Sequence, residues 1–430
     1  MNASTEISSS DEQLSGRDTY LDDHGLAAVT LTVSWSDDRA SHENHLHVDR
    51  FSVFREADAL PEEIAGTIAG MGQGDRVSTT KPDIYGIEAW SESRQMRAKP
   101  GQFDPHHRPG LVVKPRLGRF YPQGFFHRIP GIFEDAVIPA RIIDLTPDRM
   151  GVDLNHPMAR FPLQLQLRVD EILPEYDRRG GRCLDPLNDL IQFPGLAAPL
   201  ADGKLTDFGD DTASRGRMDE AEDSSFYNRP RLVQHLDTQA LKLINALYRR
   251  LLPSDAVVLD LMASYDSHLQ GTKIAGLRLL GMNHEELAAN SAATEYIVQD
   301  LNQEPSLPYP DDSLDAIVCT ASIEYLIYPE TVLADVKRIL RPGGLFIISF
   351  SNRWFPTKAI RIWSDLHEFE RVGMVTQWLQ QAGFGKLASY SAKGWPRPSD
   401  DPYITQTPLA DPVYAVWGYK DNPKKISWTG

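Results

Sequence analysis

LPYPDDSLDAIVCTASIEYL (307–326) and VLADVKRILRPGGLFIISF (332–350) are the most informative part of this chain. Residues 314–319 and 345–350 are apolar runs of strand length. Between them, PETVLADVKRIL (329–340) has the pattern of an amphipathic helix, and Arg-Pro-Gly-Gly closes it. Strands that alternate with helices predict a parallel, doubly wound α/β sheet.

The same alternation extends to both sides of this segment. A helix is predicted over 231–252, and strands over 256–261, 276–280, 297–300, 387–391 and 413–419. The last two are expected to form an antiparallel edge. Ligands of such sheets bind at the carboxyl ends of the strands, near the switch point. The loops to examine therefore follow Leu261, Leu280, Val298 and Cys319.

Two motifs carry a resemblance to a known family. LPYPDDSLD (307–315) is similar to the signature LPF-x-D-x-S-F-D, and 338–344 is similar to an R-hydrophobic-L-K/R-P-G-G turn. With them, residues 226–420 resemble class I S-adenosylmethionine-dependent methyltransferases of the type 11 group. The resemblance implies a Rossmann-like domain, S-adenosylmethionine as cofactor, and a small-molecule or protein methyl acceptor.

The resemblance also implies positions for the cofactor. Asp260 would lie near the methionine end, and Asp300 would accept a hydrogen bond from the adenine amino group. Residues 351–354 would wall the acceptor pocket. The implied cofactor-binding residues are Asp260, Ala263, Ser264, Tyr265, Asn283, Asp300, Leu301, Thr320, Ala321 and Ser322.

Two loops depart from the family pattern. Where the family has G-x-G-x-G, this chain has Met-Ala-Ser-Tyr-Asp (262–266), although glycine normally lets the backbone approach the cofactor closely. After the second strand, Asn283 replaces the acid that pairs with the ribose hydroxyls. An amide donates and accepts there more weakly than a carboxylate accepts.

The first part of the chain is dominated by strand patterns. Apolar and polar residues alternate over 27–35 and 163–172, and two strands are expected around a turn at 146–149. A short helix is expected at 61–71.

GVDLNHPMARFPLQLQLRVDEI (151–172) and LPEEIAGTIAGMGQGDRVSTTKPDIYG (60–86) resemble an FKBP-type prolyl isomerase of the SlyD branch. The resemblance implies a β-rich α+β domain with a flap inserted at about 87–145. It places Tyr85 at the edge of an aromatic pocket and Leu165 on the last strand, where the family usually has Phe. It further implies a peptide or protein partner that this domain binds or isomerises.

These patterns divide the chain into two domains. We expect a disordered tail (1–24), a SlyD-like FKBP-type domain (25–175), a linker (176–225), a methyltransferase-like domain (226–420) and a second tail (421–430). Residues 199–224 are rich in acids and poor in large apolar side chains, which predicts a mobile tether. Trypsin is expected to cut it at Arg215 and Arg217, leaving fragments that melt separately.

Composition restricts the classes of function. Sixty acidic and 44 basic residues give a net charge of −16, which disfavours nucleic acid as a partner. No apolar run approaches membrane-spanning length, so no membrane segment is expected. Two cysteines and a polar first segment favour a reducing, cytoplasmic location.

Several histidines lie at positions where a metal ligand or a general base could be expected. His42, His45, His47 and Asp49 form H-x-x-H-x-H-x-D, which we interpret as a polar strand face rather than a metal site. His268 and His284 lie in loops where a base would stand, although isolated loop histidines are usually solvated.

Two hypotheses follow for the whole chain. The first is S-adenosylmethionine-dependent methyl transfer by the second domain, with the first binding or isomerising a protein partner. The alternative is a non-catalytic chaperone or binding protein in which both clefts are degenerate. The glycine-free loop favours the second, and the intact adenine-side segment favours the first.

Overall fold

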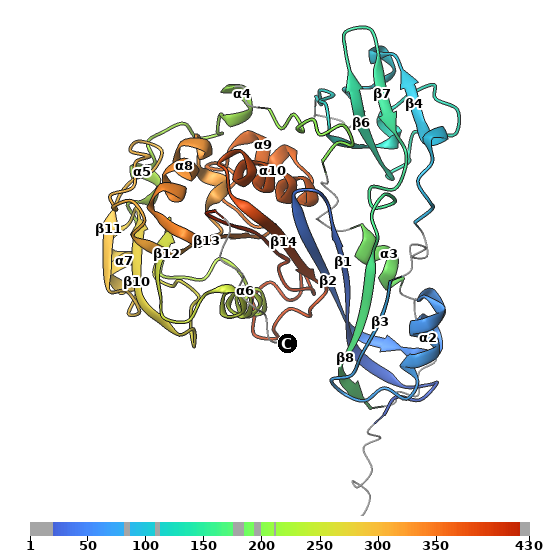
Figure 1. Cartoon of the computed structure of the whole chain (residues 1–430), viewed down its shortest axis with the longest axis horizontal. Coiled ribbons are helices and arrows are strands. Elements are labelled where there is room, and N and C mark those ends of the chain that lie inside the picture. Colours follow the sequence, from blue (N-terminus) through green and yellow to red (C-terminus); the bar gives the residue numbers. More distant parts are fainter. Residues whose placement is uncertain are drawn as a thin grey trace, which may run out of the picture.

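The computed structural model describes residues 20–80, 87–107, 112–174, 185–192, 199–209 and 212–421. An 11-stranded sheet runs through most of this part of the chain (Figure 1). In spatial order its strands are β11 (Glu295–Val298), β10 (Ile274–Gly281), β9 (Ala256–Leu261), β12 (Leu314–Thr320), β13 (Leu340–Phe350), β15 (Val413–Tyr419), β14 (Gly385–Lys393), β2 (Ala40–Ser52), β1 (Leu26–Ser36), β8 (Gln164–Leu173) and β3 (Arg76–Thr79).

The first five strands of this order form the parallel sheet that the sequence predicts. From one edge of the sheet the strands lie in the order β11, β10, β9, which is the reverse of their order in the sequence. β12 then pairs with the other side of β9, and all these pairs are parallel. The switch point therefore lies between β9 and β12. In a doubly wound sheet this is where a ligand binds, beyond the carboxyl ends of the strands. The Rossmann-like α/β prediction is confirmed for this block.

Helices cover both faces of the parallel sheet. Ile244 and Tyr248 of α6 (Thr238–Leu251) pack with Val258 and Val318. On the opposite face, α8 (Pro329–Ile339) and α10 (Glu368–Gln381) pack with residues that include Leu259 and Ile317. Short helices α5 (Asp223–Tyr227), α7 (His284–Ala289) and α9 (Arg361–Asp365) complete the block. Val258 and Leu259 are neighbours in β9, yet they belong to the apolar clusters on opposite faces of the sheet. This follows because successive side chains of a strand point to opposite faces.

The start of α6 differs from the prediction. The apolar pattern begins at 231, but the helix begins at Thr238 because the Asp237 carboxylate accepts from the backbone N–H groups of Gln239 and Ala240. This is the usual geometry of an N-cap. Residues 231–236 are consequently a loop rather than a first helical turn.

The two late strands form antiparallel pairs, as predicted, but they are not an edge. β15 lies between β13 and β14, and β14 pairs in parallel with β2 from the first part of the chain. This pairing joins the sheets of the two blocks into one. The paired residues, such as Ser389 and His42, are about 350 positions apart in the sequence. The local pattern of either strand therefore could not predict that the two strands pair.

The N-terminal block has its own core. β3, β8, β1 and β2 are antiparallel, with α1 (Val53–Glu56), α2 (Glu62–Ile68) and α3 (Pro186–Ile191) beside them. Ile64 and Ile68 of α2, and Leu187 and Leu190 of α3, are fully buried against strand residues such as Leu167. Tyr20 and Leu21 pair with 70–72, so the described end of the expected N-terminal tail is packed.

Between β3 and β8 the chain inserts a second, 4-stranded sheet, seen at the upper right of Figure 1. Its order is β4 (Gln95–Ala98), β7 (Met150–Asp153), β6 (Pro139–Leu145) and β5 (Phe120–Pro122). β6 and β7 flank the predicted turn, closed by Thr146 and Arg149. A separate cluster containing Phe103, Phe125 and Phe126 forms its core.

The expected mobile tether is anchored at several of its described residues, although 201–205 are exposed. Thr206 exchanges two hydrogen bonds with the Gln377 side chain, and Arg215, which closes α4 (Thr212–Arg215), pairs with Glu330. Arg217 pairs with Asp223, and both side chains are at most 5% exposed. The prediction of a free tether is therefore wrong for these residues, because its charges are partnered rather than solvated. The domain boundaries themselves stay predictions.

Among the described residues, no helix combines the length and apolarity that a bilayer crossing requires.

Candidate functional site

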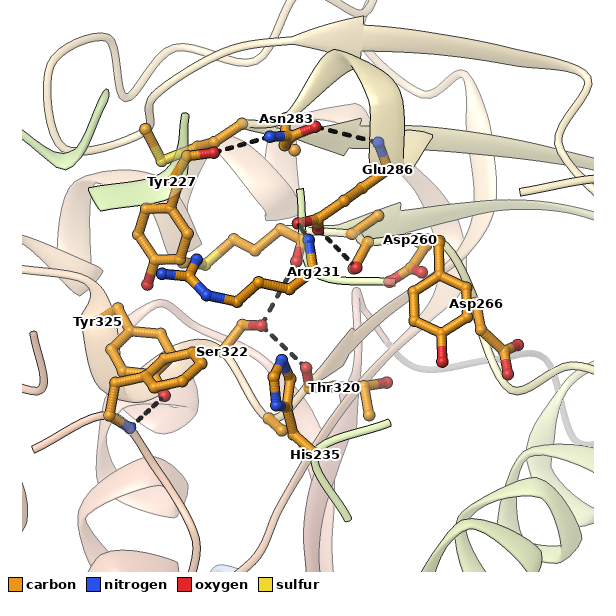
Figure 2. A pocket seen from close by; sticks show the side chains of 18 of the residues that line it. Tyr227, Arg231, His235, Asp260, Asp266, Asn283, Glu286, Thr320, Ser322 and Tyr325 are labelled. Carbon is orange, nitrogen blue, oxygen red and sulfur yellow. Dashed lines mark hydrogen bonds between the residues drawn. The ribbon is translucent and has the colours of Figure 1, made fainter. Parts of the chain in front are cut away.

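A cavity of about 250 Å³ opens at the carboxyl ends of the parallel strands, at the switch point (Figure 2). It gathers residues from six separate segments of the chain. Every cofactor-binding residue that the resemblance implies lines it: Asp260, Ala263, Ser264, Tyr265, Asn283, Asp300, Leu301, Thr320, Ala321 and Ser322.

The glycine-free first loop is held in place by a glycine on the neighbouring strand. The N–H of Ala263 donates to the Leu280 carbonyl at 2.8 Å. A side chain at Gly281 would overlap the Ala263 carbonyl, so only glycine permits this approach. Met262 takes a left-handed conformation (φ 60°), which is costly for a residue with a side chain. The loop thus has one left-handed residue without having a glycine.

Asn283 occupies the expected place but its side chain is already engaged. Its Oδ1 accepts from the N–H groups of Glu285 and Glu286, so it caps α7, and its Nδ2 donates to the Tyr227 carbonyl (Figure 2). The predicted ribose contact competes with this cap. Glu286, which the sequence analysis did not single out, lines the same cavity and accepts from Ser264 Oγ at 2.7 Å. A carboxylate is therefore present one helical turn from the expected position.

Asp260 lies at the end of β9 and is almost completely buried. Burial raises the pKa of its carboxyl to about 7, and a hydrogen bond with Ser267 opposes the rise. A carboxyl in this state can exchange a proton near neutral pH.

Asp300 and Leu301 follow β11. Asp300 accepts from the Asn302 N–H at 2.9 Å, and burial raises the pKa of its carboxyl. Leu301 is 5% exposed and offers an apolar surface beside it. Asn302 is fixed by bonds to Asp223 Oδ2 and to the Tyr325 carbonyl. An acceptor beside an apolar wall is a suitable environment for the edge and face of a purine ring.

Another part of the cavity lining combines aromatic rings with cations. Arg231 lies over the rings of Phe226 (4.5 Å) and Phe355 (5.4 Å). His235 meets Phe355 edge-on at 5.1 Å, and burial, reinforced by the charge of Arg231, lowers its pKa. The Tyr325 hydroxyl accepts from the Phe355 N–H. Sequence reasoning missed Arg231 and His235 because it assigned them to a helix.

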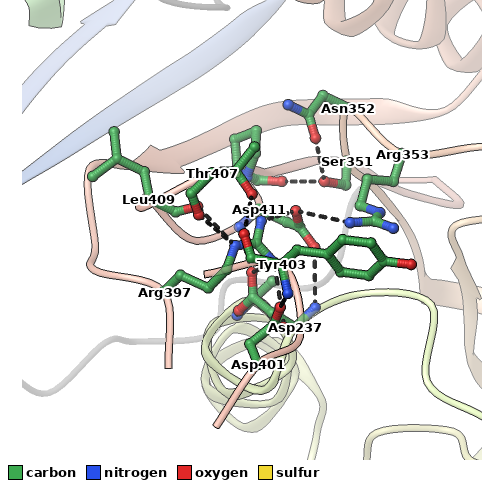
Figure 3. Close-up of polar contacts among 12 residues, drawn as sticks. Asp237, Ser351, Asn352, Arg353, Arg397, Asp401, Tyr403, Thr407, Leu409 and Asp411 are labelled. Carbon is green, nitrogen blue, oxygen red and sulfur yellow. Dashed lines mark hydrogen bonds and ion pairs between the residues drawn. The ribbon is translucent and has the colours of Figure 1, made fainter. Parts of the chain in front are cut away.

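A buried ionic network braces this end of the cavity (Figure 3). Arg397 donates to Asp411 at 2.6 Å and lies 3.4 Å from Asp237, the cap of α6. Asp411 also lies 3.8 Å from Arg353, which lines the cavity and stands over the Tyr403 ring. The network therefore ties the loop before β15 to the start of α6 and to Arg353.

The other histidines named in the sequence analysis each contact a polar side chain. His268 lines the cavity and lies 3.3 Å from Asp266, whereas His284 contacts Tyr296. His42 bonds Ser389, His45 bonds Thr32, and His47 lies 3.1 Å from Asp170. The last three therefore contact three different strands: β14, β1 and β8.

Of the two isomerase-like site residues, the structure describes Leu165 alone. Tyr85 lies outside the described residues. Leu165 is fully buried in the core of the N-terminal block. A second cavity, of about 410 Å³, opens instead where β1 and β2 meet β14, and it is lined by residues that include Trp35, His42, Pro162 and Leu163.

The fold and the main cavity define a Rossmann-like domain with a binding site at its switch point. Residues 269–348 match the family model of a methyltransferase domain (Methyltransf_11). The similarity to a methyltransferase domain thus covers the part of the chain that includes β10, β12 and most of β13.

Curated relatives match over a short region. A ubiquinone/menaquinone biosynthesis C-methyltransferase of Cupriavidus taiwanensis is 28% identical over 85 residues, 20% of this chain and 32% of that protein. A probable S-adenosylmethionine-dependent methyltransferase of Mycolicibacterium smegmatis is 32% identical over 78 residues, 18% of this chain and 30% of that protein. The chain thus spans about a third of the length of these relatives.

Solved structures cover more of the chain at lower identity. A methyltransferase of Haloferax volcanii, in complex with the activator Trm112, has 18% identity and a TM-score of 0.32 over 43% of this chain and 91% of its own. A possible histamine N-methyltransferase of Thermotoga maritima has 16% identity and a TM-score of 0.33 over 42% and 90%.

Proposed function

We propose that the protein transfers a methyl group from S-adenosylmethionine to an acceptor bound in the main cavity. The observation that carries this proposal is the convergence of all the implied cofactor positions on one cavity at the switch point. When bound, S-adenosylmethionine supplies an electrophilic methyl group on a sulfonium centre.

The residues present fit this cofactor. Asp260 and the loop at 262–265 would receive the methionine end, and Asp300 with Leu301 the adenine. Glu286 takes the role of the ribose-binding acid, because the Asn283 side chain is occupied by the cap of α7. The approach of the first loop to Gly281 offsets the absence of glycine in the loop itself.

The acceptor end favours a small aromatic acceptor that carries an acidic group. Phe355, Trp354 and Tyr325 supply rings for stacking, and Arg231 and Arg353 supply positive charge. The lowered pKa of His235 leaves more of its ring neutral near pH 7, so it can accept a proton from the acceptor. Of the residues at 351–354, Arg353 and Trp354 line the cavity, and they would form part of the acceptor wall.

Calorimetry with the full chain tests the cofactor directly. We expect S-adenosylmethionine and S-adenosylhomocysteine to bind in the micromolar range, about −8 kcal/mol. Wild-type protein that binds neither at millimolar concentration would favour the alternative, a non-catalytic binding protein with degenerate clefts.

For the N-terminal block we propose binding of a peptide or protein partner, in line with its SlyD-like FKBP resemblance. The second cavity supports this, because Trp35, Pro162 and Leu163 form an apolar wall suited to a prolyl segment. Proline-containing peptides should quench Trp35 fluorescence, and isomerisation of such peptides should slow in Trp35→Ala. A wild-type chain that neither binds nor isomerises them contradicts this second role.

A further inference from the structure

The inserted sheet brings Asp104, His107 and His127 together on its surface. Each offers one ligand atom, and these three atoms lie within 4.8 Å of one another. Asp104 Oδ2 and His127 Nε2 are 3.2 Å apart. Among the described residues this is the group of histidine and carboxylate side chains with the spacing of a metal site.

The backbone holds the two segments of this cluster in register. The N–H of Asp104 donates to the Phe125 carbonyl at 2.8 Å, and the N–H of His127 donates to the Gln102 carbonyl at 2.7 Å. Phe103 and Phe126 form a bridge between these bonds, and both are buried. The ligand-bearing segments are therefore fixed to each other before any ion arrives.

Packing also limits the position of His107. Its ring lies 4.6 Å from that of Phe125, which is buried in the core of the inserted sheet. Side-chain exposure of 33% for Asp104 and 37% for His127 leaves the ligand atoms open to solvent. A preformed half-shell with an open side leaves coordination positions for water or for a further ligand.

The cluster supplies two kinds of donor atom: a carboxylate oxygen from Asp104 and a ring nitrogen from each of His107 and His127. Two imidazoles and one carboxylate are nitrogen and oxygen donors that suit zinc and its neighbours in the first transition series, and they suit Ca²⁺ and Mg²⁺ poorly.

We propose that Asp104, His107 and His127 bind a divalent transition-metal ion, with zinc as the reference ion, and that it clamps 102–107 to 123–127. This site stands apart from methyl transfer. The inserted sheet projects away from the end of the molecule where α5 and α7 border the main cavity (Figure 1). The ion would stabilise the inserted sheet and leave an open face towards a partner.

Metal-free full-length protein, prepared with a chelator, tests the proposal by calorimetric titration with Zn²⁺. We expect a site with one ion per chain in the wild type. His107→Ala and His127→Ala should each weaken it by at least about 10- to 100-fold, the loss typical of changes to groups that merely support a ligand. His106→Ala is the matched control, since it removes a neighbouring histidine outside the cluster, and it should leave the affinity unchanged.

A spectroscopic readout separates this site from other histidines. Co²⁺ bound by the wild type and by His106→Ala should give a d–d absorption spectrum that His127→Ala lacks. Asp104→Asn keeps the size of the side chain, so it should fold and yet bind weakly. Wild-type protein without zinc affinity, or His107→Ala and His127→Ala with wild-type affinity, would overturn the proposal.

Discussion

The Arg119 guanidinium donates to both carboxylate oxygens of Glu370, at 2.7 and 3.1 Å, with the two side chains only 7% and 1% exposed. Arg119 precedes β5, an edge strand of the inserted sheet, and Glu370 lies in the first turn of α10 in the Rossmann-like block. The Phe120 N–H also donates to Glu370. The inserted sheet is thereby docked on the Rossmann-like block through a buried ion pair with two hydrogen bonds.

Arg119→Ala should lower the free energy of unfolding by about 3–5 kcal/mol, because it leaves a carboxylate buried without its partner. Urea unfolding measures the change. Arg149→Ala is the control: it removes the exposed pair with Asp144 and should cost less than about 1 kcal/mol. Equal effects of the two substitutions would show that the Arg119 pair is solvated in solution.

Limited proteolysis should spare Arg215 and Arg217 in the segment that the sequence marks as a tether. Both arginines are bound by carboxylates of packed elements, whereas Lys204, the third trypsin site of this segment, has an exposed side chain. Because β14 pairs with β2, we also expect the two blocks to unfold in one main transition. Early cleavage at either arginine, followed by two separate transitions, would restore the view of independent domains.

Asp300→Ala should weaken S-adenosylmethionine binding by about 1–3 kcal/mol, since a half-buried carboxylate would no longer accept from the adenine. Calorimetry against the wild type gives the value. Asp312→Ala is a suitable control, because Asp312 pairs with Lys420 in an exposed turn and lies outside the cavity lining. An unchanged affinity in Asp300→Ala would remove this residue from the site without removing the cofactor.

Gly281→Ala should destabilise the protein by about 1–3 kcal/mol and weaken cofactor binding, because its side chain would push the Ala263 carbonyl out of place. Gly276→Ala lies on the same strand, where the nearest atoms are 3.7 Å away, and should be tolerated. Unfolding and cofactor titration of both variants make the comparison. If they behave alike, the first loop is not anchored on Gly281.

The sequence predicted what local pattern and motif spacing encode. The parallel strands and the loops after them were located from short apolar runs. The family resemblance then assigned Asp260, Asp300 and Thr320 to the cofactor, and all three line the cavity. Asn283 was assigned in the same way, but nothing in its local pattern indicates that its amide caps α7. Contacts between distant segments, such as Arg119 with Glu370, leave no periodic trace in either segment. The sequence analysis did not predict α10, because every residue from Glu370 to Leu379 is buried and the helix therefore lacks the polar face that marks an amphipathic helix.

Glu324 should make the stability of the protein depend on pH. Its side chain is 1% exposed, and Oε2 has no hydrogen-bond partner among the described residues. Burial raises the pKa of this carboxyl from 4.5 to about 7. The folded state therefore binds the proton more tightly than the unfolded state, and the stability from this protonation is complete below about pH 4.5 and is lost as pH rises through 7.

Glu324→Gln keeps the shape of the side chain and removes the titration. Relative to the wild type, the variant should therefore gain stability between pH 5 and pH 8, by about 1–3 kcal/mol. Urea unfolding of both proteins at pH 5 and pH 8 measures how much the free energy of unfolding of each changes between the two pH values. Asp260 titrates in the same window, but it is present in both proteins and its effect cancels. A wild type and a variant whose stabilities change in parallel with pH would show that Glu324 has a solvated partner in solution.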